Sequence, residues 1–387
     1  MIEKILSYLK SFLTYGDAQA AAKIGYTSDE NEWKNFKLVI IPNGHLGKET
    51  TLPFMGNIQP EKVQNTFIIR DDIIYTCFFF ISRSEELIVH DRDTHGRFNA
   101  KFSILGKNNR LQIPLLDEYA RSVMKLLELP LPKPQFNRIY LTHDIDTIAY
   151  YRHLRGFIGG WLRDGMDAVL DAANDIHNDP AYTFPWLVEQ DKKIKDAHII
   201  YFVKHTLGKG YDYPQYNLIG KDFRNLKSYL EAHGATLGFH SSYYGNLPEF
   251  RLPAINYKLH RSHYLRCSID HMQALADAGI TDDFTMAFPD MAGFRLQTTR
   301  AVRWINPKNM TLTNLTLHPL TIMDCTLSNG NYMNLSEEEA YYYCLQLIDK
   351  VRQHNGDLCL LWHNSIINST TYHKQLYTAL LDAIRRQ

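Results

Sequence analysis

Two aspartates separated by one residue follow an apolar run in the segment LTHDID. Asp144 and Asp146 come just after the strand expected over residues 138–142. If strand geometry continues through them, their carboxylates lie on one face and repel each other unless a proton or a metal ion lies between them. A solvated turn with a helix-capping aspartate is the alternative explanation of the same residues.

Two histidines end two other apolar runs. His240 follows a glycine closely in LGFHSS, and a neutral imidazole at that place suits a metal ligand. His363 ends LLWH, where an imidazole at the mouth of an apolar pocket suits general acid–base chemistry near neutral pH. Taken alone, each histidine is equally well explained as a hydrogen-bonded structural residue.

The segment RSHYLR adds fixed positive charge. Arg261 cannot lose its proton, so it can stabilise a carboxylate or a developing oxyanion. A basic surface strand is the alternative explanation of this segment. Two more carboxylates, Asp290 and Asp324, also come just after apolar segments.

The elements that must position these residues alternate between strand and helix. Ser336 and Glu339 form a capping-box pair that opens a helix. That helix is expected to end near Gln353, with Gly356 as its C-cap. Further helices are expected over residues 225–233 and 269–278, each capped by a glycine (Gly234, Gly279), and strands over 138–142, 235–239, 284–288 and 358–362. This alternation predicts a mainly parallel sheet or barrel with its chemistry at the carboxyl ends of the strands.

The first third of the chain has a different organisation. Residues 129–137 (LPLPKPQFN) contain three prolines and are typical of a linker. Before them come an amphipathic helix over 2–13, apolar β-prone runs at 36–42, 66–70 and 73–82, and a helix over 117–129. We therefore predict a small α/β domain in residues 1–130 and a larger α/β domain in residues 131–387.

Composition narrows the class of protein. Of the 387 residues, 42 are Lys or Arg and 42 are Asp or Glu, so no net field favours nucleic acid or an anionic membrane. Five cysteines without a C-x-x-C pair argue against a disulfide framework and against a structural zinc site. No apolar run approaches the about 20 residues that span a bilayer, and no cleavage site follows the N-terminal helix. We expect a cytoplasmic protein without a transmembrane segment; the sequence does not specify its oligomeric state.

In their order and spacing, these motifs resemble those of the polysaccharide deacetylase superfamily. This is the NodB-like fold, also called carbohydrate esterase family 4. Asp-x-Asp after the first strand is followed by His, by Arg-x-x-Tyr, by a strand with Asp and by Leu-x-x-His, over about residues 135–387. The resemblance implies a distorted (β/α) barrel, usually seven-stranded, with one divalent cation, commonly zinc, at the strand ends. The segments FFFISRSEEL and HGRF resemble an accessory domain that precedes this barrel in a bacterial subgroup.

The resemblance also implies roles for single residues. Asp144 resembles the catalytic base, and Asp146 resembles the metal-binding aspartate. Arg261 resembles the arginine that tunes the base. His363 resembles the general acid, and Asp324 resembles the aspartate that orients that acid.

One metal ligand departs from the family pattern. His240 and Ser241 fit the first two places of the motif H-[ST]-x-x-H, but the second histidine would fall on Tyr244. Because tyrosine is a poor zinc ligand, the site needs another third ligand. His263, which stands where the family usually has proline in the adjacent motif, is the expected replacement, and His143 is the next candidate.

The implied activity is metal-dependent hydrolysis that removes acetyl groups from N-acetylated sugar units of a glycan or glycan precursor. Two alternatives stay open: a catalytically degenerate glycan-binding barrel, which the tyrosine at position 244 favours, and a hydrolase of small cyclic amides. A third possibility is that the N-terminal domain has a separate function of its own. The alternative is that its polar residues only form salt bridges in an interdomain surface. Its polar candidates are Arg83, Glu85, Glu86, His95 and Arg97.

Overall fold

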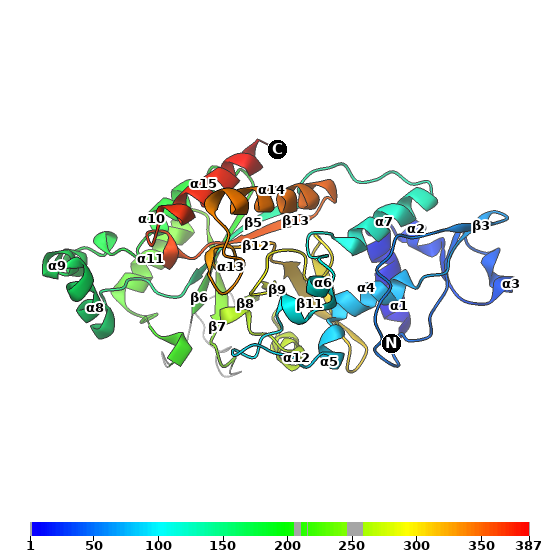
Figure 1. The fold of residues 1–387 in the computed structure, drawn as a ribbon, viewed down its shortest axis with the longest axis horizontal. Helices are drawn as coiled ribbons and strands as arrows, with labels where there is room; N and C mark the ends of the chain where they lie inside the picture. Colours follow the sequence, from blue (N-terminus) through cyan, green and yellow to red (C-terminus); the bar gives the residue numbers. More distant parts are fainter. Residues whose placement is uncertain (1, 205–209, 215, 246–257, 387) are drawn as a thin grey trace.

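A four-stranded sheet and a nine-stranded sheet form the scaffold (Figure 1). The computed structural model describes residues 2–204, 210–214, 216–245 and 258–386. The small sheet lies in the N-terminal part, in the order β1-β2-β4-β3. Its strands are β1 (Ile24–Tyr26), β2 (Leu38–Ile40), β3 (Glu61–Val63) and β4 (Thr66–Ile69). The strands expected over residues 36–42 and 66–70 are therefore confirmed.

The N-terminal part also contains helices. They are α1 (Ile2–Leu13), α2 (Ala18–Ala22), α3 (Glu30–Trp33), α4 (Ile73–Ser82), α5 (Glu85–Ile88), α6 (Ile104–Lys107) and α7 (Leu115–Leu126), with one 3₁₀ turn, η1 (Ala100–Phe102). The amphipathic helix expected at the N-terminus and the helix expected over residues 117–129 are confirmed as α1 and α7.

The prediction of a β-prone run over residues 73–82 was wrong, because this segment is the helix α4. All of its residues are buried, and a continuous apolar run has no periodicity that separates a strand from a fully buried helix. Asp72 begins the helix by accepting a hydrogen bond from the backbone N–H of Tyr75. Arg83 ends it in the left-handed conformation.

The nine-stranded sheet has the order β10-β11-β9-β8-β7-β6-β5-β13-β12. Its strands are β5 (Arg138–Ile145), β6 (His198–Lys204), β7 (Thr236–Ser241), β8 (Leu259–Ser262), β9 (Asp282–Met286), β10 (Val302–Asn306), β11 (Thr311–Pro319), β12 (Ile322–Met323) and β13 (Asp357–Leu361). All neighbours pair in parallel except β10 and β11. The predicted mainly parallel sheet is confirmed.

The sheet is curled but not closed by a strand ladder. β11 and β13, six places apart in the sheet order, contact each other, and the backbone N–H of Thr321 donates to Cys359 of β13. Between the outermost strands β10 and β12, no pairing is found in the described part of the chain. The predicted barrel is therefore not confirmed as a closed sheet.

Helices connect the strands of the large sheet. They are α8 (Leu154–Asp164), α9 (Met166–Asn174), α10 (Phe184–Asp191), α11 (Lys221–Ala232), α12 (Ile269–Asp277), α13 (Asp324–Ser328), α14 (Glu337–Gln353) and α15 (Thr371–Arg385), with 3₁₀ turns η2 (Ile176–Asn178), η3 (Gly210–Asp212), η5 (His263–Leu265) and η6 (Asn364–Ile366). In Figure 1, α8 and α9 lie at the end of the molecule opposite to the N-terminal part. None of the described helices combines the length and the apolar character needed to cross a membrane.

Most of the predicted helix caps are confirmed. Ser336 and Glu339 form the expected capping box, and Gly234 and Gly279 follow α11 and α12 with positive φ. Gly356, however, was wrongly predicted as the C-cap of α14. The residue with positive φ there is Asn355, whereas a Cβ on Gly356 would lie 2.2 Å from Oγ1 of Thr299, so close packing requires this glycine.

The N-terminal part and the large sheet share one hydrophobic core. This core joins buried residues between Ile5 and Leu127 with buried residues between Ile269 and Leu317, including Trp304 of β10. A buried ion-pair network also joins the N-terminal part to the large-sheet part. In it, Glu86 accepts from Arg83 at 2.8 Å and from Arg295 at 2.7 Å. These contacts favour the salt-bridge explanation of the N-terminal charges. The division at residue 130 itself stays a prediction.

Candidate metal and catalytic site

The carboxyl ends of neighbouring parallel strands bring the predicted residues to one edge of the sheet. Asp144 lies near the end of β5, and Asp146 comes just after it. His240 of β7 pairs in register with Arg261 of β8. His263 follows β8 directly.

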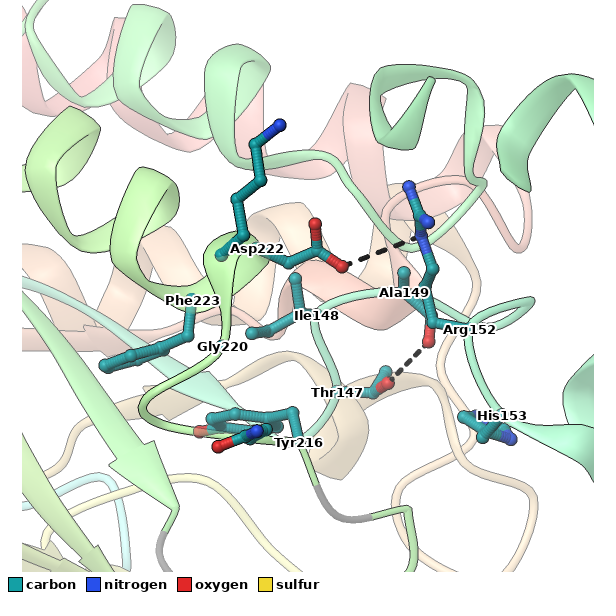
Figure 2. A pocket seen from close by; sticks show the side chains of 11 residues that line it. Thr147, Ile148, Ala149, Arg152, His153, Tyr216, Gly220, Asp222 and Phe223 are labelled. Carbon is teal, nitrogen blue, oxygen red and sulfur yellow. Dashed lines mark hydrogen bonds and ion pairs between the residues drawn. The ribbon is translucent and has the colours of Figure 1, made fainter. Parts of the chain in front are cut away.

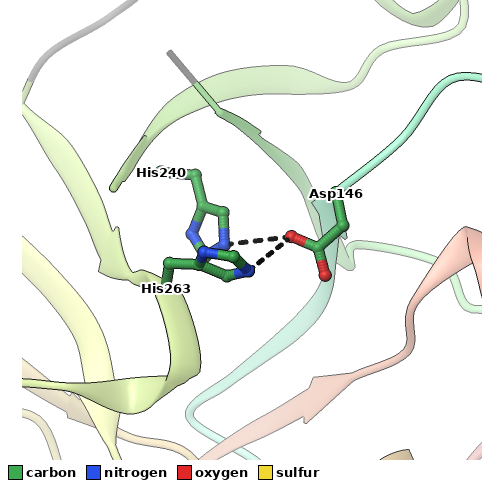
Figure 3. A group of neighbouring side chains, drawn as sticks. All are labelled: Asp146, His240 and His263. Atoms are coloured by element: carbon green, nitrogen blue, oxygen red, sulfur yellow. Dashed lines mark ion pairs between the residues drawn. The ribbon is translucent and has the colours of Figure 1, made fainter. Parts of the chain in front are cut away.

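Asp146, His240 and His263 form a cluster that could hold a metal ion, because one ligand atom from each lies within 4.8 Å of the others. Figure 3 shows both imidazoles facing the Asp146 carboxylate. Oδ1 of Asp146 is 3.5 Å from Nε2 of His240 and 3.2 Å from Nε2 of His263. Both histidines are buried, whereas the Asp146 side chain is 29% exposed and faces the cavity described below.

Tyr244, at the family-motif position, and His143, the other candidate for the third ligand, both lie elsewhere. The side chain of Tyr244 is on the surface, where the residue is 59% exposed. His143 is fully buried, and its two ring nitrogens contact Trp362 O at 2.7 Å and Asp191 Oδ2 at 2.9 Å. His263 is thus the histidine that accompanies Asp146 and His240.

The second ring nitrogen of each clustered histidine is held by an acceptor. Nδ1 of His240 donates to the carbonyl oxygen of Arg261 at 3.0 Å, and Nδ1 of His263 donates to Oδ1 of Asp212 at 2.9 Å. These acceptors fix the proton on Nδ1, so that Nε2 faces the cluster. Nε2 of His240 and Oδ1 of Asp146 are buried atoms without a hydrogen-bond partner among the described residues.

Electrostatics differ between the three side chains. Burial lowers the pKa of His240 and keeps this imidazole neutral. Burial also opposes protonation of His263, but the charge of the nearby Asp146 and the hydrogen bond to Asp212 outweigh it and raise its pKa. For Asp146, burial works toward a higher pKa, yet His263 and His240 hold the pKa of this carboxyl well below its usual range.

Asp144 and Arg261 form a buried ion pair beside this cluster. Nη1 of Arg261 lies 3.2 Å from Oδ1 of Asp144, and Nη2 donates to Thr142 Oγ1 at 2.8 Å. Arg261 is fully buried, which excludes the alternative of a basic surface strand. The other oxygen of Asp144 is 3.6 Å from Nε2 of His240.

His363 and Asp324 form a second pair close to the same aspartates. Asp324 follows β12 directly, and its Oδ1 lies 2.8 Å from Nδ1 of His363. Nε2 of His363 is 3.9 Å from a carboxylate oxygen of Asp144 and of Asp146. Burial tends to lower the pKa of His363, but the charge of Asp324 outweighs burial and raises this pKa well above its usual value.

These side chains open into a cavity of about 320 Å³. It is lined by Asp144, Asp146, His263 and His363 together with Arg97, Tyr264, Leu265, Met323, Cys325, Asn329, Tyr332, Leu361, Ser365 and Ile366. Such a mixture of apolar walls and a few polar groups is typical of a small-ligand site.

A second cavity, of about 340 Å³, is lined in part by residues 147–149, the segment that follows Asp146 (Figure 2). Its walls include Thr147, His153 and Tyr216 and an ion pair of 3.7 Å between Arg152 and Asp222. None of the predicted site residues lines it.

Sequence reasoning missed several residues of the site. Asp212 and Tyr332 had no strand signal before them, and Arg97 was considered only for a separate N-terminal function. Nη2 of Arg97 donates to the hydroxyl of Tyr332 at 2.8 Å. Conversely, Asp290 lies outside the site, because it accepts the backbone N–H of Ala100 at 2.7 Å.

Comparisons with known proteins add little. A family model described as a family of unknown function, DUF7033, matches residues 3–132. No curated protein matches the chain. A structure from Mycobacterium smegmatis is provisionally assigned as a polysaccharide deacetylase. It is 12% identical, with TM-score 0.42, and the match covers 66% of this chain and 87% of the Mycobacterium chain. A second structure, from Bordetella bronchiseptica, is provisionally assigned as a polysaccharide deacetylase involved in O-antigen biosynthesis. It is 16% identical, with TM-score 0.29, and the match covers 65% of this chain and 84% of the Bordetella chain. Because both TM-scores lie below 0.5, neither similarity decides the fold or the function of this chain.

Proposed function

We propose that the protein is a metal-dependent hydrolase that removes acetyl groups from N-acetylated sugar units of a glycan or glycan precursor. The observation that carries this proposal is the cluster of Asp146, His240 and His263, flanked by the two pairs Asp144–Arg261 and His363–Asp324. We also infer that the curled sheet corresponds to the distorted (β/α) barrel of that superfamily. In support, His263 after β8 and Met323 of β12 line one cavity, although five steps of about 4.8 Å would separate these strands in a flat sheet.

The cluster fits a divalent cation such as zinc. Two imidazole nitrogens and one carboxylate are an ordinary ligand set for catalytic zinc, which keeps a further position open. Nε2 of His240 and Oδ1 of Asp146 are buried and form no hydrogen bond among the described residues, and a cation would give both atoms a close partner. When bound, the cation would polarise an acetamide carbonyl and lower the pKa of a water molecule.

Asp144 is placed to act as the general base. The Arg261 guanidinium lies 3.2 Å from Oδ1 of Asp144 and holds this carboxylate, which can accept a proton from an attacking water. Because Arg261 stays charged, it also holds Asp144 in place after that transfer.

His363 is placed to act as the general acid. Asp324 favours the protonated imidazole and fixes its Nδ1, so Nε2 can donate its proton to the leaving amine. Nε2 of His363 lies 3.9 Å from a carboxylate oxygen of Asp144, so one proton acceptor and one proton donor line the same cavity.

The experiment that tests this function compares bound zinc in the parent protein and in Asp146→Ala, His240→Ala and His263→Ala. We expect near-stoichiometric zinc in the parent, lost in all three variants, and retained in the control His143→Ala. Acetate release from N-acetylglucosamine oligomers by the zinc-loaded protein then tests the reaction. A parent that takes up no zinc would overturn the metal-dependent mechanism, and zinc binding without acetate release would favour the glycan-binding alternative.

A further inference from the structure

The second histidine of the cluster stands on a different strand from the one that the family motif predicts. His263 comes from the end of β8, whereas the motif would place its second histidine shortly after β7, at Tyr244. A relocated ligand needs its own support, because a free imidazole can rotate and can carry its proton on either nitrogen. The residue that supports His263 is Asp212, in the turn η3 after β6.

Asp212 is itself held firmly. Its Oδ1 accepts the backbone N–H of Tyr243 at 2.8 Å as well as the Nδ1–H of His263 at 2.9 Å. Asp212 is 3% exposed and His263 is 5% exposed, so water hardly competes for this contact. The carboxylate can only accept, which leaves Nε2 of His263 directed at Asp146.

Two other buried aspartate–histidine pairs lack this arrangement. His260 contacts Asp283 at 2.7 Å, but its Nε2 contacts Ser241 Oγ at 3.0 Å. In the pair of His143 and Asp191, the second ring nitrogen contacts a backbone carbonyl. Both imidazoles are therefore occupied on both sides. The pair of Asp212 and His263 instead directs one nitrogen toward the cavity that contains Asp146.

We propose that Asp212 is the positioning residue of the relocated ligand: it fixes the tautomer and the ring orientation of His263 and thereby sets the affinity of the cluster for a divalent cation. This inference rests on the proposed metal site. Loss of such an outer carboxylate typically lowers metal affinity about 10–100-fold.

The test measures zinc affinity of the full chain by competition with a chromophoric chelator. We expect Asp212→Ala to bind zinc about 10–100-fold more weakly than the parent, and Asp212→Glu to recover part of the loss. The matched control is Asp283→Asn, which removes a buried carboxylate from a histidine outside the cluster and should keep the parent affinity even if it lowers thermal stability. Nitrogen chemical shifts of the His263 ring report its tautomer and should change only in the Asp212 variants.

Each outcome decides the proposal. Equal zinc affinity of parent and Asp212→Ala would overturn the role of Asp212 while leaving the metal site intact. An equal loss in Asp283→Asn would also overturn it, because the effect would then be general packing. If Asp212→Ala does not fold, Asp212→Leu, which has a similar size but accepts no hydrogen bond, is compared with the parent in the same way. A parent without zinc affinity would instead overturn the proposed function, and this inference with it.

Discussion

At the scale of single residues, the charge of His363 depends on one buried carboxylate. The protonated imidazole is favoured because Asp324 lies 2.8 Å from its Nδ1, whereas burial alone would favour the neutral ring. A raised folded-state pKa means that the proton is retained to higher pH and is lost only as the pH rises through that pKa. The proposed general acid is thus kept in its active form around neutral pH.

Asp324→Asn should therefore lower the pKa of His363. The amide removes the charge that opposes burial, so the imidazole loses its proton at a lower pH. The measurement is an NMR titration of the His363 ring in the metal-free protein, and in an active enzyme the alkaline limb of the pH–rate profile should move to lower pH. The control Asp283→Asn should leave this titration unchanged. An unaltered pKa of His363 in Asp324→Asn would show that another group sets its charge.

At the scale of elements, the strand from which a ligand projects matters more than its motif. Tyr244 stands in the motif position for a metal ligand, yet it lies on the surface after β7. Its hydroxyl lies close to Gly210, where a Cβ would come within 3.2 Å of it. From this exposure we expect that a histidine at position 244 would not reach the cluster without a change of the local backbone.

The double variant His263→Ala with Tyr244→His should therefore bind zinc no better than His263→Ala alone. Zinc competition with a chelator measures this, with Tyr244→His alone as the control that keeps the parent affinity. Recovered affinity in the double variant would mean that the segment after β7 can rearrange to supply the ligand, and that the ligand position is not fixed by β8.

Local signals in the sequence predicted the elements that carry the site. The capping box of α14 and the glycines after α11 and α12 involve only neighbouring residues, so they can be recognised from the sequence without knowledge of the fold. Asp146, His240 and His263 could be predicted to meet because parallel strands end at one edge. The helix α4 and the contact of Asp212 with His263 could not be predicted. The first depends on burial from all sides, and the second joins residues 51 positions apart in the chain.

Gly356 illustrates a role that only packing reveals. We expect Gly356→Ala to destabilise the fold by about 1–3 kcal/mol, because the new Cβ would press on Thr299. The matched control is Gly159→Ala in α8, where nothing lies within 4 Å of the Cβ and alanine should stabilise the helix by up to about 1 kcal/mol. Chemical denaturation measures both changes. A neutral Gly356→Ala would show that Thr299 moves away freely.

At the scale of the whole molecule, the N-terminal part takes part in the pocket as well as in the core. Arg97 lines the cavity, donates to the carbonyl oxygen of Tyr264 at 3.3 Å, and is held by an ion pair of 2.8 Å with Asp93. His95 of the same turn lies 3.2 Å from the hydroxyl of Tyr243. The region that matches a family of unknown function thus contributes Arg97 to the lining of the candidate site.

Because the N-terminal part packs against the large sheet, we can predict how the isolated C-terminal part would behave. Residues 133–387 alone would expose the face of β10 and β11 that α1 and α4 cover, including Trp304, which is fully buried in the whole chain. They would also leave Arg295 without its carboxylate partner Glu86. We therefore expect this fragment to be insoluble or unfolded, and co-expression with residues 1–132 to restore a soluble complex. The measurement is near-ultraviolet circular dichroism of the fragment, beside a thermal unfolding curve of the whole chain that should show one transition. A folded fragment that binds zinc like the parent would contradict this and would make residues 1–130 an independent accessory domain.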